Sequence, residues 1–513
     1  MIPFDFQKYL RSKDFKVLLS RFQQHLINGD GGFFDSDELL DIAEYYHLKD
    51  DLGSARKAVE YCLELYPGNT KALVFLARTF VMSGDVDKAQ LMLDEIHDDN
   101  SVDVKYLRAE LLICRNDIDA ANGYLQQQYD ALQSATSDLF SEVEEEDAEE
   151  DYANYPLDVC LLFCDYQVWD KAEWWLACVT DPELVSNGDY IEAKARILTA
   201  QGKYKEAIAT WNSYIDIDAY STLAWIQLSQ CHFHEGNCAE ALQCAEYAES
   251  IDPNLSETYI SEANYLFSMG KSGEAVEKIN KYMELCPDDI QGELFISSVL
   301  FSMGKYEEAD QHITKACNAL TDYDEDDSFP NAVRIDILRQ AAYICSAQGR
   351  MDDAMLFVDK TLFYGMSEEQ HLLLCAGIYL EHGDVKIAFE KFSQALAASN
   401  HDPATYIIVA NMVIDAGLYE QGYNLLSQIL DVLGESGVDN GVGYDRYAYA
   451  AFMTGHYREF LDALEVCTVK SPSETATIFS SYFPEGMPVS DYLQYAREHH
   501  IDAGASADNN VTQ

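Results

Sequence analysis

The sequence repeats itself with a period of 34 residues. The hexapeptide GKYKEA at Gly202–Ala207 returns as GKYEEA at Gly304–Ala309, which begins 102 residues, or three periods, later. Two further copies, GNCAEA at Gly236–Ala241 and GKSGEA at Gly270–Ala275, lie one and two periods after the first. A chain with such a period stacks similar units in a row, and each unit contacts mainly its neighbours. The sequence therefore predicts a repeat array rather than a fold around one central core.

Eight less regular copies extend the repeat over most of the chain. Aligned on the last residue of the hexapeptide, they end at Ala55, Ala89, Ala121, Ala172, Ala354, Ala388, Gly422 and Phe460. Together with the four regular copies they give twelve units.

Other columns of this alignment also hold residues of a single type. Twelve residues before the aligned position every residue is small: Ala43, Ala77, Ala109, Cys160, Ala195, Ser229, Ala263, Ser297, Ala342, Ala376, Ala410 and Ala448. Four residues after it every residue is apolar: Val59, Leu93, Leu125, Leu176, Trp211, Ala245, Ile279, Ile313, Val358, Phe392, Leu426 and Leu464. Between the two columns, glycines recur: Gly84, Gly202, Gly236, Gly270, Gly304, Gly349, Gly383, Gly417 and Gly455.

These columns describe a hairpin of two α-helices. Apolar residues recur at helical spacing in each half of the unit, which is the pattern of a helix with one buried face. The glycine suits the left-handed backbone at the end of a first helix. Pro67, Pro253 and Pro287 follow second helices, where they prevent continuation. Small residues in both helices let the two backbones approach closely, and a larger side chain there would cost about 1–3 kcal/mol through overpacking.

The pattern over residues 36–470 resembles the tetratricopeptide repeat family, whose units have 34 residues, small residues where the helices cross and a late proline. The tryptophan usual in the first helix is absent, and Leu39, Leu73 and Leu107 stand in that region. The repeats, including the segment LYPGN, are also similar to those of long cytosolic tetratricopeptide repeat proteins of Bacteroidota-type bacteria. The resemblance implies an all-α solenoid of about twelve helical hairpins, wound into a right-handed superhelix with a helical cap at each end.

The breaks in the period give the expected organisation of the chain. The predicted parts are an N-terminal helical cap (1–35), repeats one to three (36–134), an acidic linker (135–153), repeats four to eight (154–320), an acidic loop (321–330), repeats nine to twelve (331–470), a C-terminal helical cap (471–500) and a disordered tail (501–513). Insertions in repeat arrays fall between units, and blocks of like charge stay solvated.

Two interpretations of the acidic segments SEVEEEDAEED and TDYDEDD remain open. Each is either a disordered, solvated loop, which is the commoner case, or a segment that docks a basic partner or folds back over the groove. The first segment is also a candidate hinge between a short N-terminal array and a long C-terminal one. A calcium loop at Asp322, Asp324 and Asp326 is disfavoured, because Asp327 and Val333 stand where such a loop has Gly and Glu.

Composition limits the partners. The chain has 89 acidic and 34 basic residues and a formal net charge of −55. Such a charge disfavours nucleic acid and anionic membrane surfaces and favours a basic partner. The first residues do not form a signal peptide, and no apolar run is long enough to span a bilayer. Thirteen singly scattered cysteines indicate reduced thiols. We therefore predict a soluble, cytoplasmic protein without membrane insertion.

The sequence offers no catalytic or metal motif. The cluster CHFHEGNC brings together Cys231, His232, His234 and Cys238, but these positions coincide with core and turn columns of the repeat, so packing is the favoured interpretation. Cys160 and Cys164 lie one helical turn apart without a second pair. No phosphate-binding, dinucleotide-binding or hydrolase motif occurs. We predict no enzyme activity, no cofactor and no bound metal.

The family resemblance implies that ligands contact the first helices, which line the concave face. Transferring its contact columns to this chain predicts partner contacts at Arg78, Glu192, Arg196, Gln230, Asn264, Ser298, Arg339, Tyr343 and Asn411. Phe233, Phe267 and Phe301 occupy the same region, but their recurrence every 34 residues favours packing. Arg196 and Asn264 match the residue types that clamp a chaperone C-terminus, but Gln230 lies between them, so that activity is not carried over.

The expected function is a scaffold or adaptor that binds a protein or peptide in the concave groove. The alternative is a regulatory sensor or co-chaperone in which a bound peptide changes the shape of the superhelix.

Overall fold

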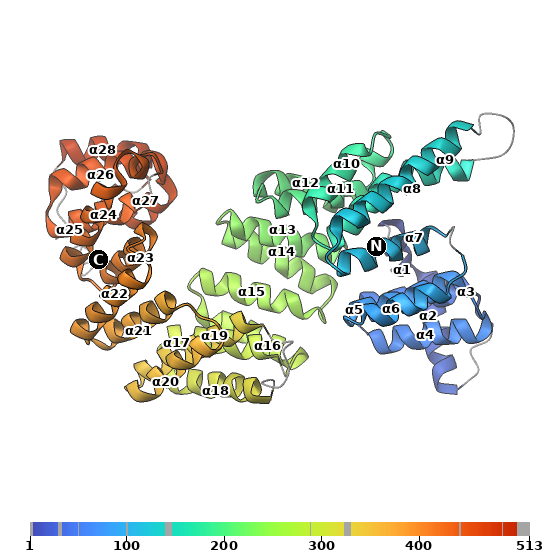
Figure 1. Ribbon diagram of the computed structural model, residues 1–513, viewed down its shortest axis with the longest axis horizontal. Coiled ribbons are helices and arrows are strands. Elements are labelled where there is room, and N and C mark those ends of the chain that lie inside the picture. Colours follow the sequence, from blue (N-terminus) through green and yellow to red (C-terminus); the bar gives the residue numbers. More distant parts are fainter. Residues whose placement is uncertain are drawn as a thin grey trace. The chain divides into compact units, whose positions relative to one another are not determined.

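The computed structural model describes residues 4–28, 33–49, 51–98, 101–138, 146–287, 289–322, 330–440, 443–484 and 486–499. The described residues form 28 α-helices and two short 3-10 helices, without a strand, which confirms the predicted all-α class. The chain divides into two compact units, Met1–Met269 and Gly270–Gln513. Figure 1 shows helices in succession within each unit.

The helices of the first unit are α1 (Phe4–Leu10), α2 (Lys13–Asn28), α3 (Ser36–Leu48), α4 (Leu52–Leu65), α5 (Thr70–Met82), α6 (Val86–Glu95), α7 (Val102–Cys114), α8 (Ile118–Asp138), α9 (Glu146–Asp165), α10 (Trp169–Cys178), η1 (Leu184–Ser186), α11 (Gly188–Ala200), α12 (Tyr204–Ile217), α13 (Thr222–His234), α14 (Cys238–Ile251) and α15 (Ser256–Ser268).

Those of the second unit are α16 (Ser272–Leu285), α17 (Ile290–Ser302), α18 (Tyr306–Asp322), α19 (Asn331–Ala347), α20 (Met351–Phe363), α21 (Glu368–His382), α22 (Val385–Ala398), α23 (Pro403–Asp415), α24 (Tyr419–Asn440), α25 (Tyr444–Thr454), α26 (Tyr457–Lys470), α27 (Pro472–Phe479), η2 (Ser480–Tyr482) and α28 (Val489–Glu498).

Successive helices pair as hairpins in both units, from α3 with α4 to α13 with α14, and from α17 with α18 to α25 with α26. The columns of the alignment explain this pairing. Every residue of the small column is fully buried, and so are the aligned alanines and the final Phe460. The aligned Gly422 leaves no room for a side chain, because a Cβ there would lie 2.3 Å from Cγ1 of Ile414. The helical-hairpin solenoid predicted from the sequence is confirmed.

The turn between the helices of a pair needs a left-handed residue. All nine glycines of that column have positive φ angles, from 70° at Gly202 to 96° at Gly383. Two less regular copies place a residue with a side chain there, with φ of 61° at Asn116 and 58° at Gln167. Because a Cβ disfavours this conformation, these two turns are strained relative to the glycine turns.

Replacing Gln167 by glycine is therefore expected to stabilise the protein. Relief of the left-handed strain outweighs the added flexibility of the unfolded chain, and the expected gain is about 1 kcal/mol, or about 1–2 °C in Tm. Asn116→Gly is the matched comparison and gains less, because asparagine tolerates this conformation. Calorimetry of the two variants measures both gains. A lower Tm for Gln167→Gly would show that its side chain stabilises the turn.

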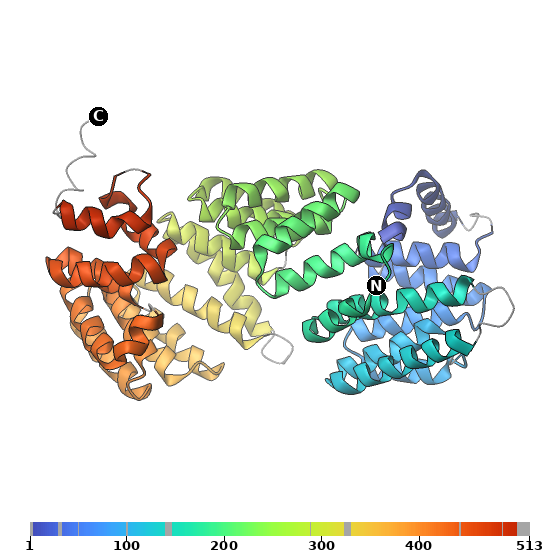
Figure 2. The same cartoon turned by 90° about the horizontal axis from the view of Figure 1, so that it is seen from above.

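The acidic insertion after the third repeat lengthens helices instead of forming only a loop. α8 has 21 residues and ends at Asp138, and α9 has 20 residues and begins at Glu146. The two helices lie side by side in both views (Figures 1 and 2). Of the predicted linker 135–153, residues 139–145 lie outside the described residues, as do 323–329 of the second acidic segment.

The helices on the two sides of this insertion, where a hinge was predicted, pack against each other. The hydroxyl of Tyr155 in α9 donates to the carbonyl of Leu125 in α8 (3.1 Å), and Nε1 of Trp175 in α10 donates to Oδ1 of Asn122 in α8 (2.9 Å). One hydrophobic cluster joins α7 to α11 across the insertion. The boundary between the compact units falls at residues 269 and 270 instead.

Helical caps flank the repeats, as predicted. At the N-terminal end, α1 and α2 bury Phe15 and Phe22 against Phe34 and the first hairpin. At the C-terminal end, the rings of Phe483 and Tyr492 stack at 3.9 Å and fix α28. Residues 501–513, predicted to be a disordered tail, lie outside the described residues.

Candidate functional site

The first helices of the first unit share a hollow, which we call the groove pocket. It has a volume of about 600 Å³. It is lined by His47 and Leu48 of α3, Leu161, Cys164 and Asp165 of α9, Gln167, Trp169 of α10, Asp189, Glu192, Arg196, Thr199 and Ala200 of α11, and Leu223 and Gln227 of α13. Apart from Gln167 and Trp169, all of these residues come from the first helix of a pair.

Acidic side chains dominate the polar lining of the groove pocket. Asp165, Asp189 and Glu192 face a single arginine, Arg196. Arg196 donates to Oδ1 of Asp165 at 3.0 Å and lies 3.7 Å from Glu192. Since the lining holds three carboxylates and one guanidinium, the pocket retains negative charge. Trp169 and the leucines provide apolar surface beside it.

Among the carboxylates of the groove pocket, Glu192 has a strongly raised pKa. It is only 7% exposed and accepts a hydrogen bond from the hydroxyl of Tyr214 at 3.3 Å. Burial raises the pKa of Glu192 to about 7, against the lowering effect of Arg196 and with further raising by Asp189 and Asp165. Its charge therefore changes near neutral pH.

Contacts over long sequence separations close the first unit around this pocket. Arg11, in the turn between α1 and α2, donates to the carbonyl of Tyr220 at 2.8 Å and to the buried carboxylate of Asp218. Lys49, just after α3, forms an ion pair with Asp252. These contacts hold the end of α3, with His47 and Leu48, opposite α11 and α13.

Removing both cations is expected to loosen this closure. In Arg11→Gln/Lys49→Gln the buried carboxylate of Asp218 loses its charged partner, and the exposed pair with Asp252 is lost, at a cost of about 2 kcal/mol. Hydrogen exchange in α3 should become about tenfold faster or more, and 0.5 M salt should act in the same direction. Lys57→Gln, an exposed lysine on α4, is the control. Unchanged exchange in the double variant would show that the contacts do not hold α3.

Arg78, predicted to contact a partner, lines a second hollow of about 210 Å³ between α3, α5 and α7. Its guanidinium binds Glu110 of α7, with an N–O distance of 2.8 Å. Burial lowers the pKa of Arg78, but the carboxylates of Glu110, Asp103 and Glu44 together raise it more, so the net shift is upward. In the second unit, Arg446 binds Asp415 at 2.7 Å. Like Arg196 with Asp165, both pairs join neighbouring first helices, so Arg78 and Arg196 use their charge within the fold.

The remaining predicted contact residues divide between the units. In the first unit, Gln230 of α13 is half-buried and Asn264 of α15 is exposed, and neither lines the groove pocket. Gln227, one turn before Gln230, lines it instead. On α13, the amide that lines the pocket therefore lies one helical turn before the predicted contact residue.

In the second unit, the predicted residues lie on α17, α19 and α23. Ser298 donates to the carbonyl of Leu294 at 3.0 Å, and Arg339 pairs with Asp336 at 2.9 Å on its own helix. Burial raises the pKa of Tyr343. Oδ1 of Asn411 is buried without a hydrogen-bond partner among the described residues. The structure brings none of these four into the groove pocket.

Residues of the cysteine and histidine cluster at the end of α13 pack against neighbouring side chains. The ring of His234 stacks on Tyr204 at 4.6 Å, and Cys231 is buried next to Thr199. Phe233 packs on Tyr265 with ring centroids 5.0 Å apart, as predicted for that column. Within the part of the chain that the structure describes, no three His, Cys, Asp or Glu side chains are placed to hold a metal ion.

Sequence reasoning missed most of the groove pocket. Asp165 follows the small column by five residues, and no repeat column marks it as a contact. His47 and Leu48 line the pocket only because the long-range contacts of Arg11 and Lys49 hold the end of α3 opposite α11 and α13. The negative charge of the chain was the one signal available for an acidic site.

None of the described helices is long and apolar enough to cross a bilayer.

Comparisons with known proteins give one sequence match. Residues 47–111, from the end of α3 to α7, match the sequence model of the tetratricopeptide repeat family. No curated protein matches the chain.

Solved structures with similar arrangements have low sequence identity to this chain. The chain is similar to MamA, with 15% identity, a TM-score of 0.29, and coverage of 33% of this chain and 93% of MamA. It is similar to a tetratricopeptide repeat protein from Parabacteroides merdae, with 14% identity, a TM-score of 0.41, and coverage of 51% and 98%. It is also similar to a chain of the APC/C hetero-tetramer Cut9–Hcn1, with 15% identity, a TM-score of 0.32, and coverage of 94% and 98%.

The family match covers α4, the hairpin of α5 and α6, and most of α7, and the same buried small residues and left-handed turns recur in other described hairpins. Residues 47–111 thus match the tetratricopeptide repeat family, and the helical-hairpin architecture continues in the hairpins on either side.

Proposed function

We propose that this protein is a non-enzymatic scaffold that binds a protein partner in the groove pocket of its first unit. The partner inserts a cationic side chain, lysine or arginine, between Asp165, Asp189 and Glu192. The observation that carries this proposal is the pocket itself, about 600 Å³ in volume, whose lining holds three carboxylates and one arginine that pairs with two of them. The family match supports it, because tetratricopeptide repeats present a preformed surface to partners.

The shape and lining of the groove pocket suit an extended peptide. Leu161, Leu223 and Trp169 can cover the aliphatic part of a long cationic side chain. The carboxylates then accept hydrogen bonds from its charged end, which are stronger than neutral ones. Because the scaffold is already folded, binding does not require it to order its own helices.

The probe peptide Ac-Leu-Lys-Leu-NH2 tests this proposal by calorimetry. Its control is the same peptide with norleucine, which keeps the aliphatic chain and removes the charge. We expect the lysine peptide to bind at least tenfold more tightly, because each charge-assisted hydrogen bond contributes about 1.5–3 kcal/mol. Equal affinity of the two peptides would rule out a cation site.

A regulatory sensor is the second candidate function, and the closure by Arg11 and Lys49 favours it. A peptide that enters the groove pocket competes for the space between α3 and α11, so binding could be coupled to opening of the first unit. Small-angle scattering with and without the lysine peptide separates the candidates. An unchanged profile supports the static scaffold, and a change in the radius of gyration supports the sensor.

A further inference from the structure

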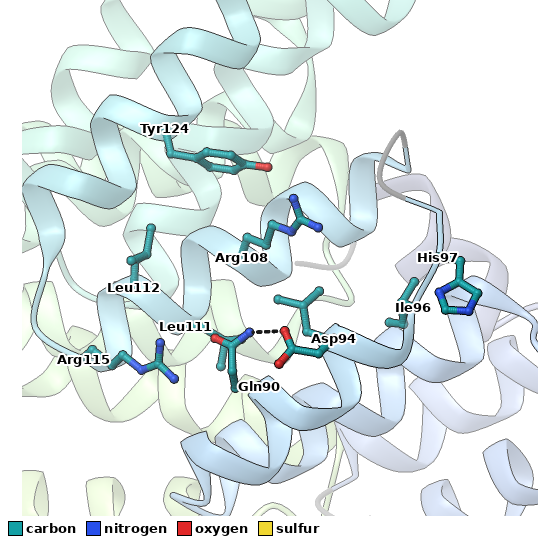
Figure 3. A pocket seen from close by; sticks show the side chains of 10 residues that line it. Gln90, Asp94, Ile96, His97, Arg108, Leu111, Leu112, Arg115 and Tyr124 are labelled. Carbon is teal, nitrogen blue, oxygen red and sulfur yellow. Dashed lines mark hydrogen bonds between the residues drawn. The ribbon is translucent and has the colours of Figure 1, made fainter.

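A second pocket, which we call the outer pocket, lies among α6, α7 and α8 and has a volume of about 580 Å³ (Figure 3). It is lined by Gln90, Leu93, Asp94, Ile96, His97, Arg108, Leu111, Leu112, Arg115 and Tyr124. The groove pocket lies on first helices, whereas this one opens between two second helices.

A shortened helix accounts for the outer pocket. α6 has 10 residues, whereas the second helices α4 and α12 have 14. The chain leaves α6 at Ile96 with an extended backbone. The shortening appears in the sequence as the spacing of 32 residues between Ala89 and Ala121. The missing helical turn leaves part of α7 without the cover that a full second helix would give.

The uncovered face of α7 carries a defined stripe. Arg108, Leu111, Leu112 and Arg115 follow one another at helical spacing, so they lie on one side of the helix. Figure 3 shows Leu111 and Leu112 between Arg108 and Arg115. Glu110, which binds Arg78, lies about 200° around the helix from Arg108. The outer pocket and the first-helix wall therefore occupy opposite sides of α7.

The lining combines an apolar floor with donors at the rim. Leu93, Ile96 and Leu111 are buried beneath the pocket. Arg115 is exposed, and no carboxylate of the described residues pairs with it. The carboxylate of Asp94 accepts a hydrogen bond from Gln90 at 2.9 Å. In a chain with a net charge of −55, a pocket with two arginines stands apart from the general acidity of the surface.

We infer that the outer pocket binds an acidic, apolar segment of a protein partner, in which a carboxylate side chain adjoins an aliphatic one. The guanidinium of Arg115 can bind the carboxylate with two parallel hydrogen bonds, a geometry specific to arginine. The floor of Leu93, Ile96 and Leu111 takes the aliphatic group out of water. A free phosphate has no aliphatic part, so it would use only the rim of the pocket.

Together with the proposed scaffold function, the chain then has two binding sites that prefer ligand side chains of opposite charge. The groove pocket takes a cationic side chain, and the outer pocket takes an anionic one on the other side of the first-helix wall. The two sites do not depend on each other, so one can fail without the other.

The probe is Ac-Leu-Glu-Leu-NH2, with Ac-Leu-Gln-Leu-NH2 as the uncharged control, titrated into the full chain. We expect the glutamate peptide to bind about tenfold more tightly than the glutamine peptide. Arg115→Gln should remove that difference and leave binding of Ac-Leu-Lys-Leu-NH2 unchanged. Arg458→Gln, an exposed arginine of α26 in the other unit, is the matched control and should change nothing.

Hydrogen exchange locates the bound peptide independently of affinity. Protection by the glutamate peptide should appear in α6 and at the end of α7, and it should be absent from α11. Equal binding of the glutamate and glutamine peptides, or full binding to Arg115→Gln, would overturn the proposal. A doubling of the mass of the free chain that Arg115→Gln abolishes would also overturn it, because a second copy would then occupy the pocket.

Discussion

The variant Ala241→Phe is expected to unfold about 3–6 °C below the parent protein. Ala241 is the aligned residue of α14 and is fully buried where α14 crosses α13. It lies in the same hairpin as the small-column residue Ser229, whose hydroxyl is 2.9 Å from that of Tyr265 on the next first helix. A phenyl ring at this crossing must separate the backbones or displace that contact, at a cost of about 3 kcal/mol.

The control for this variant lies on the same helix. Ala239 is exposed on α14, and Ala239→Phe is expected to change the stability by less than about 0.5 kcal/mol. Thermal unfolding followed by circular dichroism compares the two. If Ala241→Phe unfolded at the same temperature as the control variant, the assignment of the crossing column would be wrong.

The second large effect concerns Glu192 and pH. With a pKa of about 7, Glu192 is mostly neutral at pH 6 and mostly ionised at pH 8. Binding of Ac-Leu-Lys-Leu-NH2 should therefore strengthen about tenfold between these two pH values, because the charged form of Glu192 is the one that attracts the ligand.

Glu192→Gln should remove most of this pH dependence and leave weak binding at both pH values. Glu240→Gln, an exposed glutamate on α14, should keep the pH dependence of the parent protein. A variant Glu192→Gln that bound the lysine peptide tenfold more tightly at pH 8 than at pH 6 would contradict the assignment.

Stability separates a binding effect from unfolding. The folded protein raises the pKa of Glu192 above its ordinary value of 4.5, so between these values the folded state holds more protons than the unfolded state. The contribution of this group to stability is therefore full below pH 4.5 and is lost as the pH rises through 7. Glu192→Gln lacks that loss and should be at least as stable as the parent protein at pH 8. Weaker binding with undiminished stability would then reflect the missing charge.

The repeat columns predicted the fold because they are local. The glycine of a turn and the small residue of a crossing are set by contacts within one hairpin, so a period in the sequence reports them directly. The helical extension of α8 and α9 was missed because a block of glutamates repels itself, which favours a loop, but glutamate also has good helix propensity. The packing of Tyr155 and Trp175 on α8 stabilises the helical conformation.

The site depends on contacts that no period records. Arg11 meets Asp218 across 207 positions of the chain, and Lys49 meets Asp252 across 203. Family columns singled out Glu192 and Arg196, and both line the groove pocket from a first helix. They could not show that Arg196 is bound to Asp165, or that Gln227 rather than Gln230 faces the pocket. The outer pocket does have a signal in the sequence, because the spacing between Ala89 and Ala121 is two residues shorter than the period of 34.

The central claim is that partners bind the first-helix wall of the first unit. Photo-crosslinking in cells tests it most directly, with a benzophenone side chain in place of either Gln227 in the groove pocket or Gln243 on the exposed surface of α14. We predict protein crosslinks from the position of Gln227 that are lost when Glu192→Gln is added, and few from the position of Gln243. Crosslinks from the position of Gln243 with none from that of Gln227 would contradict the account.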